Sequence, residues 1–286
     1  MAITIITDST SYIDKDVQKQ YGIEILSLFF TYGNESIKEV DVDNKTFYQR
    51  MEKEGIPISS QPSIGETEAL MRSILDKGND IIGVFISSDF SGTFNSASLV
   101  ANTLKEEYPD RKITIIDSRS NSMQLGFSVL VGARLAKKGE SYSKIVEAIE
   151  ANTKHSRFLF IPDNLDYLEK GGRIGKAGAL FGNMLKITPI LTVEDGSVEV
   201  YKKVRTKKRA ILAMVDKMNQ DNAVSKIKEI AIHHINCMDE ALEFEKILKK
   251  NFDVDILISS IGPVIGLHVG PGAVGVVYYT DAEIPL

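Results

Sequence analysis

The sequence predicts an α/β protein with two domains, one built on a parallel sheet and one on a mixed sheet. Short aliphatic segments alternate with segments of helical length through the first half of the chain, and this alternation favours strands joined by helical crossovers. The second half adds the hairpin signal Asp195-Gly196 to such an alternation, which favours some antiparallel pairing. The chain has 286 residues, a length that suits two domains of ordinary size.

In the first half, aliphatic runs predict the strands and capping residues predict the helix starts. The strands are expected at residues 2–6, 23–31, 80–86 and 112–116. The helices are expected at residues 43–54, 63–77, 93–108, 122–138 and 141–152. Asp43 or Asn44 can cap the first of these helices, Gly55 can end it, and Ser63 to Glu66 have the form of a capping box. Strands separated by helices of this length predict a mostly parallel sheet.

In the second half, strands are mixed with a hairpin and fewer helices. The strands are expected at residues 157–161, 190–193, 197–204, 230–235, 254–259 and 276–279. Thr206 can cap one helix, and a second helix is expected at residues 238–250. Two stretches, at residues 170–182 and 262–275, are rich in glycine. The change of pattern predicts a boundary near Asn152, with domains at residues 1–152 and 153–286.

Composition and charge narrow the classes of function. The formal net charge is −5, from 34 basic and 39 acidic residues, which argues against nucleic acid as the main partner. No stretch approaches the run of about 18 apolar residues that a membrane-spanning helix needs, and the first ten residues do not resemble a secretion signal. The single cysteine, Cys237, cannot form an internal disulfide, which fits a reducing compartment. Together these features predict a cytoplasmic protein.

Hydroxyl-rich turns follow three of the strands expected in the first half: Thr7–Thr10, Ser87–Thr93 and Asp117–Ser120. The carboxyl ends of parallel strands share one edge of a sheet, so these turns are expected to line one crevice. A fourth polar loop, Ser59–Ser63, leads into a helix. The candidate crevice residues, besides those discussed below, are Ser9, Thr10, Ser60, Gly92, Thr93 and Ser118. The alternative interpretation is that they are ordinary helix caps.

The crevice has the composition of a binding site more than of a hydrolytic one. Ser91 and Gly92 precede a helix, whose free N–H groups and dipole favour an anionic oxygen. A serine nucleophile needs a neighbouring base, but the chain has only four histidines and no G-x-S-x-G motif. The alternative is a stand-alone phosphotransferase or hydrolase that uses the same serine-rich crevice.

Two glycine motifs are near matches to nucleotide-binding signatures. Gly175-Lys176 resembles the end of a P-loop, but Lys170 stands in place of the first glycine and Ala177 in place of the serine or threonine. The segment Gly270–Gly275 fits G-x-G-x-x-G literally, but it leads into an expected strand rather than a helix. Neither motif predicts a nucleotide site.

Metal binding is not expected, because His233 and His234 are adjacent and on a strand point to opposite faces. His268 lies in a glycine-rich segment whose backbone can approach a ligand closely.

Six basic residues form a cluster, which is interpreted as a solvated face. The alternative is a docking surface for an acidic partner or for transient contact with an anionic membrane. The cluster consists of Lys202, Lys203, Arg205, Lys207, Lys208 and Arg209.

Five motifs, taken together and in order, resemble the DegV family of bacterial fatty-acid-binding proteins, the carrier subunit of fatty acid kinase. They are Thr7–Thr10, Ser60–Ser63, Ser91–Ala97, Leu168–Ile174 and the glycine-rich segment around His268. Each motif is weak alone, but their order and spacing are specific, and the resemblance extends from Thr7 to Gly275. One position departs from it, because the family usually has threonine where this chain has Ser59.

The resemblance implies a fold and a ligand. It implies a DegV-like, two-domain α/β protein that holds one long-chain fatty acid in a tunnel between the domains. The acid's carboxylate would meet the hydroxyls of Ser59 and Ser91, with His268 in the same hydrogen-bond network. Arg173 would lie near the tunnel mouth.

The resemblance also implies a partner. A separate ATP-dependent kinase would phosphorylate the bound carboxylate, and the acyl-phosphate would enter phospholipid synthesis. This chain would then need no cofactor and would not be an enzyme by itself. A third hypothesis is a regulatory protein that senses an acyl ligand and acts on a partner through the basic cluster.

Overall fold

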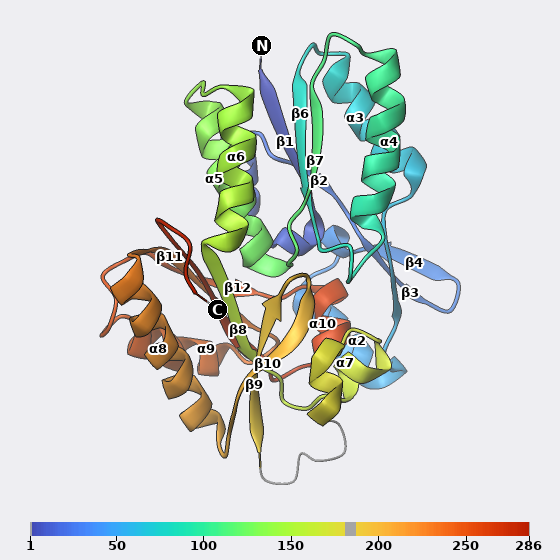
Figure 1. Cartoon of the computed structure of the whole chain (residues 1–286). Helices are drawn as coiled ribbons and strands as arrows, with labels where there is room; N and C mark the ends of the chain where they lie inside the picture. The colour runs from blue at the N-terminus through green and yellow to red at the C-terminus, as the bar shows by residue number, and fades with distance from the viewer. Residues whose placement is uncertain (1, 181–186, 286) are drawn as a thin grey trace. The chain divides into compact units, whose positions relative to one another are not determined.

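The computed structural model describes residues 2–180 and 187–285, and residues 181 and 182 of the first glycine-rich stretch lie outside this description. The chain divides into two compact units, which are best followed by colour in Figure 1. The first unit holds residues 1–41 and 58–153, and the second holds residues 42–57 and 154–286. Residues 42–57, which were predicted to belong to the first domain, belong to the second unit.

Most elements of the first unit coincide with the predicted ones. Its strands are β1 (Ile3–Asp8), β2 (Glu24–Leu26), β3 (Phe29–Tyr32), β4 (Glu35–Lys38), β5 (Ile58–Ser60), β6 (Asp80–Phe85) and β7 (Ile113–Asp117). Its helices are α1 (Lys15–Tyr21), α3 (Ile64–Leu75), α4 (Thr93–Glu107), α5 (Ser122–Lys137) and α6 (Tyr142–Lys154), with short 3-10 turns η1 (Ser9–Ser11) and η2 (Glu39–Asp41). The predicted capping box is present, with Ser63 and Glu66 bonding each other's backbone N–H groups.

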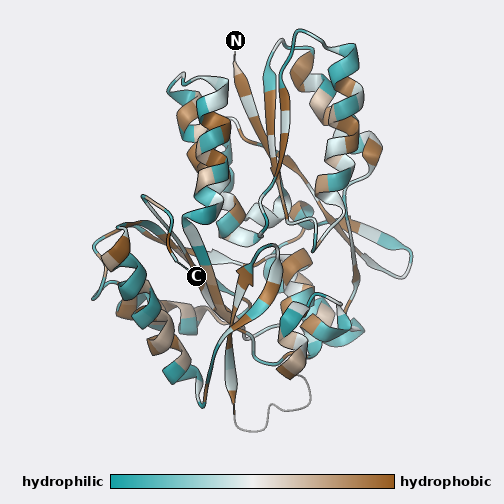
Figure 2. Cartoon of the chain, viewed as in Figure 1, coloured by the Kyte–Doolittle hydropathy of each residue, from teal (hydrophilic) through white to brown (hydrophobic). Residues whose placement is uncertain are grey.

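The main sheet of the first unit is parallel throughout, as predicted, in the order β2-β1-β6-β7. Figure 1 shows α3 and α4 beside one face of this sheet and α5 and α6 beside the other. Residues from α3 and α4, such as Met71 and Leu104, pack on Ile6 and Phe85 of the strands. Strands β1 and β6 are buried over most of their length, and Figure 2 shows brown segments along the strands of this sheet.

One predicted strand is two strands in two different sheets. The run 23–31 breaks after Leu26, because the N–H of Leu28 donates to the hydroxyl of Ser9 at 3.0 Å instead of continuing the ladder. The chain then enters a small antiparallel sheet of order β4-β3-β5. The turn at Gly33-Asn34 joins β3 to β4.

The second unit also follows most of the predicted elements, and its described residues include two helices, α7 and α10, that were not predicted. Its strands are β8 (Ser156–Ile161), β9 (Thr188–Glu194), β10 (Ser197–Val204), β11 (Ile227–His234), β12 (Ile256–Ser260) and β13 (Val274–Thr280). Its helices are α2 (Asn44–Glu54), α7 (Asp166–Lys170), α8 (Lys207–Val224), α9 (Met238–Leu248) and α10 (Pro263–Val269), with a 3-10 turn η3 (Gly175–Leu180).

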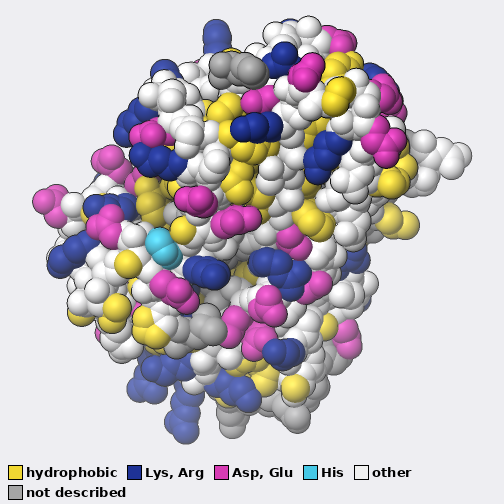
Figure 3. All heavy atoms as spheres, turned by 45° about the horizontal axis from the view of Figure 1, so that its top comes forward, with side chains coloured by type: hydrophobic (Ala, Val, Ile, Leu, Met, Phe, Trp, Pro, Cys, Tyr) yellow, Lys and Arg dark blue, Asp and Glu magenta, His cyan; other side chains and the backbone are white. Residues whose placement is uncertain are grey.

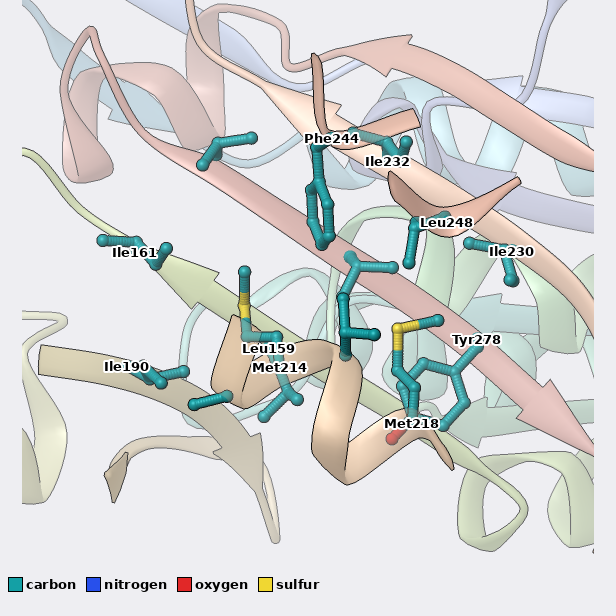
Figure 4. Packing of buried hydrophobic residues seen from close by; sticks show 14 of the residues in the cluster. Leu159, Ile161, Ile190, Met214, Met218, Ile230, Ile232, Phe244, Leu248 and Tyr278 are labelled. Carbon is teal, nitrogen blue, oxygen red and sulfur yellow. The ribbon is translucent and has the colours of Figure 1, made fainter. Parts of the chain in front are cut away.

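The sheet of the second unit is mixed, in the order β10-β9-β8-β13-β11-β12, and among the strands of the described residues only β11 and β12 pair in parallel. Asp195 and Gly196, with φ of 43° and 83°, form the predicted two-residue hairpin turn between β9 and β10. Helices α8 and α9 cover one face of the sheet. Figure 4 shows the resulting core, where Met214, Met218 and Phe244 of the helices pack on strand residues such as Ile232.

Helix α10 lies inside the second glycine-rich stretch, where no helix was predicted. Its signals are nevertheless local, because Pro263 occupies its first turn and Gly270, with φ of 86°, ends it. Helix α2, capped by Asp43 and ended by Gly55 as predicted, packs against α10. This contact explains why residues 42–57 belong to the second unit.

Candidate functional site

The polar turns after β1 and β6 are joined through a buried carboxylate, Asp8. Its Oδ2 accepts a hydrogen bond of 2.7 Å from the backbone N–H of Ile86, and its Oδ1 accepts one of 3.0 Å from the N–H of Thr10. Burial raises the pKa of Asp8 to about 6, although these hydrogen bonds act in the opposite direction. Asp8 therefore holds the carboxyl ends of two neighbouring strands together.

A second buried carboxylate, Glu39, engages the same turn. The hydroxyl of Ser9 donates to Glu39 at 2.6 Å, and that of Tyr12 donates at 2.9 Å. Ser9 and Thr10 are both buried, and each has a partner inside the first unit. Their contacts are those of structural side chains that shape the edge of the sheet.

The turns after β6 and β7 also converge, as the sequence analysis expected. The N–H of Ser87 donates to the carbonyl of Ser120 at 2.8 Å. The guanidinium of Arg119 lies 2.8 Å from the carboxylate of Asp89 and 3.1 Å from the hydroxyl of Ser88. Ser118 is buried and donates to the carbonyl of Ser120 at 3.1 Å, so its hydroxyl serves the turn itself.

Ser91 sits at the start of α4, as predicted, and is half-buried. Its Oγ lies 2.9 Å from the hydroxyl of Thr93 and accepts a hydrogen bond of 3.3 Å from the N–H of Thr93. The N-cap residue of the helix is Gly92, which has no side chain to bond the first N–H groups. The turn therefore presents a hydroxyl and a helix N-terminus at one place, a combination that suits an anionic oxygen.

The fourth polar loop reaches this helix start through Gln61. Its amide nitrogen donates to the hydroxyl of Ser96 at 2.7 Å. Its Oε1 lies so close to Gly92 that a Cβ at that residue would be only 2.2 Å from it. Ser59 is half-buried on β5, opposite Phe30 of β3. The loop that carries Ser59 is thus attached directly to the turn that carries Ser91.

Two other serines of this loop differ from Ser59. Ser60 is exposed. Ser63 is the N-cap of α3, since its Oγ accepts a hydrogen bond of 3.1 Å from the N–H of Glu66. The interpretation as an ordinary cap, which was the alternative at every site, therefore holds for Ser63.

In the second unit, His268 and Arg173 lie close together around the backbone of Gly171. A Cβ at Gly171 would lie 2.2 Å from Nδ1 of His268, and Arg173 donates a hydrogen bond of 2.7 Å to the carbonyl of Gly171. Burial, and then the positive charge of Arg173, lower the pKa of His268 to about 4. The imidazole is therefore neutral at pH 7 and can both donate and accept a hydrogen bond.

Helix α10, which carries His268, is held by residues that sequence reasoning missed. The hydroxyl of Tyr48 lies 2.0 Å from where a Cβ at Gly266 would be, so only glycine allows this close approach. The ring of Tyr167 of α7 also lies close to Gly270, since a Cβ there would be 2.3 Å from its Cδ2 atom. The apolar face of α2, with Phe47, Tyr48 and Met51, was the sequence signal for a packed helix, but not for its partner.

Several of the remaining sequence motifs form structural contacts within the second unit. His233 and His234 are adjacent on β11, and Nδ1 of His233 lies 3.1 Å from the carbonyl of Ser259. Lys176 forms an ion pair with Glu199. The segment Gly270–Gly275 runs into β13, as expected. Within residues 2–180 and 187–285, no three His, Cys, Asp or Glu side chains are grouped so that they could hold a metal ion.

Five of the six residues of the basic cluster are exposed, whereas Lys207 is ion-paired with Glu240. Over much of the face drawn in Figure 3, acidic and basic side chains are interspersed, with one group of Lys and Arg side chains at its lower edge. In the described part of the chain, no helix is both long enough and apolar enough to span a bilayer.

Comparisons with known proteins all find the same family. A family model described as "Uncharacterised protein, DegV family" matches residues 2–281. A DegV domain-containing protein from Clostridium acetobutylicum is 51% identical, with 99% of this chain and 100% of the relative covered. Protein DegV from Bacillus subtilis is 34% identical, with 96% of this chain and 98% of the relative covered.

Solved structures give the same result for the fold. The crystal structure of DegV from Bacillus subtilis, described as a fatty acid binding protein, has a TM-score of 0.89 at 32% identity and covers 98% of this chain and 100% of its own. A DegV family protein from Thermus thermophilus, described by its fatty acid binding, has the same TM-score at 27% identity, with 98% of this chain and 100% of that one covered. A stearic-acid-binding protein from Eubacterium ventriosum has a TM-score of 0.88 at 25% identity, with 97% of this chain and 98% of that one covered.

Proposed function

The chain belongs to the DegV family, and we propose that it binds a long-chain fatty acid and presents the carboxylate to a separate ATP-dependent kinase. The observation that carries the proposal is the match over 98% of the chain to a DegV structure described as fatty acid binding. In this proposal, Ser59, Ser91, Arg173 and His268 contact the head group. The interdomain tunnel and the entry of the acyl-phosphate into phospholipid synthesis are part of the same proposal.

The acyl chain would supply most of the affinity. About 14 buried methylenes at roughly 0.8 kcal/mol each contribute on the order of 11 kcal/mol. The loss of rigid-body freedom removes several kcal/mol, which leaves micromolar or tighter binding. Specific polar contacts are needed for a different reason, because an unpaired carboxylate is costly to bury.

Neutral donors and one cation suit this head group. The hydroxyl of Ser91 and the neutral imidazole of His268 can each hydrogen-bond either form of a carboxyl group. Arg173 adds a positive charge that favours the ionised form, which is the nucleophile in phosphoryl transfer. These three side chains together support a carrier that keeps its ligand reactive.

The contacts of Ser91 support a carrier more than a hydrolase. Within the described residues, its Oγ bonds to the hydroxyl and the N–H of Thr93, neither of which can act as a general base. An acyl-transfer serine requires such a base within hydrogen-bond distance. The hydroxyl is therefore better suited to orient a ligand than to attack one.

Mass spectrometry of an organic extract of the purified protein tests the proposal. A copurified long-chain acid in near-stoichiometric amount is the expected result, and binding of added stearic acid after lipid removal should follow. ATP should then be consumed only when the acid, this chain and the kinase are all present. ATP turnover by the isolated chain would instead favour a stand-alone phosphotransferase, and failure to bind any acid would contradict the proposal.

A further inference from the structure

Arg119 connects the turn after β7 to the turn that carries Ser91. Its guanidinium lies 2.8 Å from Asp89, 3.1 Å from the hydroxyl of Ser88 and 3.3 Å from Asp117. Asp89 and Ser88 belong to the turn after β6, whereas Asp117 ends β7. One side chain therefore holds the two turns against each other.

The backbone of Arg119 does not explain why an arginine stands here. Its φ is 53°, in the left-handed region that costs a residue with a Cβ about 1 kcal/mol or more and suits glycine best. The conformation is held because the N–H of Arg119 donates to Asp117 at 2.8 Å. The contacts of the guanidinium are thus the feature that needs an explanation.

The charges around Arg119 explain why an arginine occupies this position. Asp89 and Asp117 place two carboxylates around the one guanidinium of Arg119, and Ser91 follows Asp89 by two residues. Ser91 is tied into the same turn, because its N–H donates to the carbonyl of Ser87 at 3.1 Å. Without Arg119, both carboxylates would repel an anionic ligand at Ser91, and the turn would lose two of its attachments.

We propose that Arg119 is a positioning residue that holds the Ser88–Ser91 turn and offsets Asp89 and Asp117, so that Ser91 can receive a carboxylate. This inference rests on the proposed function, since it assigns a role at the same head-group site. Arg119 and Asp89 are partly exposed, with side-chain exposures of 35% and 49%, so solvent screens the ion pair. The expected effect on affinity is accordingly modest, about fivefold.

The test compares two ligands of equal chain length in the variant Arg119→Gly. Glycine adopts the observed φ without strain, so the variant should fold with an unfolding temperature close to that of the wild type. Stearic acid should bind about fivefold more weakly, whereas stearyl alcohol, which carries no charge, should bind as in the wild type. A change in this acid-to-alcohol ratio is a readout that general loosening of the turn would not produce.

Two further variants complete the experiment. Asp89→Asn combined with Arg119→Gly should recover part of the acid affinity, because one repelling carboxylate is removed. Arg111→Gly is the matched control, since Arg111 precedes β7 at the opposite end of that strand and its loss should leave both affinities unchanged.

Three outcomes would overturn the inference. These are equal weakening of both ligands in Arg119→Gly, no weakening of either, and no recovery in the double variant. If wild-type protein binds neither ligand, the proposed function itself fails, and the role of Arg119 fails with it.

Discussion

The hydroxyl of Tyr48 donates a hydrogen bond of 2.8 Å to the carbonyl of Ile261, a residue 213 positions away in the sequence. The same hydroxyl lies 3.3 Å from the carbonyl of Gly262, and Tyr48 is only 1% exposed. A helix from the N-terminal part of the chain thereby fixes the backbone immediately before α10, which carries His268. The position of His268 therefore depends on a side chain far from it in sequence.

Replacing Tyr48 by phenylalanine should lower the free energy of unfolding by about 1 kcal/mol, because buried carbonyls lose their donor. Urea unfolding followed by circular dichroism measures the change. Tyr108→Phe is the control, since its hydroxyl bonds to Asp76 at the surface, and its cost should stay below about 0.5 kcal/mol. Equal costs for the two variants would contradict the importance of the Tyr48 contact.

Adding a methyl group at Gly171 should displace His268, because the new Cβ would lie 2.2 Å from its Nδ1. We expect Gly171→Ala to weaken stearic acid binding about tenfold, because the carboxylate would lose one charge-assisted hydrogen bond. Gly178→Ala provides the matched control, since its Cβ would have only an ordinary contact of 3.5 Å with Ile174. Isothermal calorimetry compares them, and unchanged binding in Gly171→Ala would remove His268 from the site.

His268 should stay neutral throughout the range in which free histidine titrates. Its pKa is lowered to about 4, first by burial and then by the charge of Arg173. In Arg173→Gln the second cause is absent, so the pKa should rise while remaining below the ordinary value. NMR titration of the imidazole carbon-bound protons measures both values, and an unchanged pKa in the variant would show that the two side chains do not interact.

Asp8 should make the stability depend on pH. Its pKa is raised from 3.8 to about 6 in the folded protein, chiefly by burial. The folded state therefore binds the proton more tightly, so this contribution to stability is complete below about pH 4 and is lost as the pH rises to about 6. The difference in unfolding free energy between wild type and Asp8→Asn should fall across this window. A difference that is constant with pH would contradict the raised pKa.

Ser91→Ala should affect phosphorylation of the bound acid more than binding of the acid. The hydroxyl orients the head group, whereas the buried methylenes dominate the affinity. Binding is measured by calorimetry with stearic acid, and phosphoryl transfer by ATP consumption with the kinase partner. Ser63→Ala, which removes a helix cap, controls for loss of stability. Equal losses in binding and phosphorylation would refute this division of roles.

Much of the candidate site could be located from strand order alone. The turns after β6 and β7 converge, and that after β1 joins them through Asp8, because the carboxyl ends of parallel strands share one edge. What strand order does not show is the use of each hydroxyl. Ser9 and Ser118 bond inside the protein, whereas Ser91 lies partly exposed at a helix start, and the three look alike in sequence.

The sequence by itself determined the fold class, most of the helices and strands, and the hairpin at Asp195-Gly196, because caps, turns and apolar periodicity act over a few neighbouring residues. Only the tertiary structure decided that the run 23–31 serves two sheets, that α2 belongs to the second unit, and that Arg119 joins two turns. These features depend on contacts between distant segments, such as Tyr48 with Ile261. These contacts stabilise the protein only once the distant segments have packed together, so no local sequence pattern predicts them.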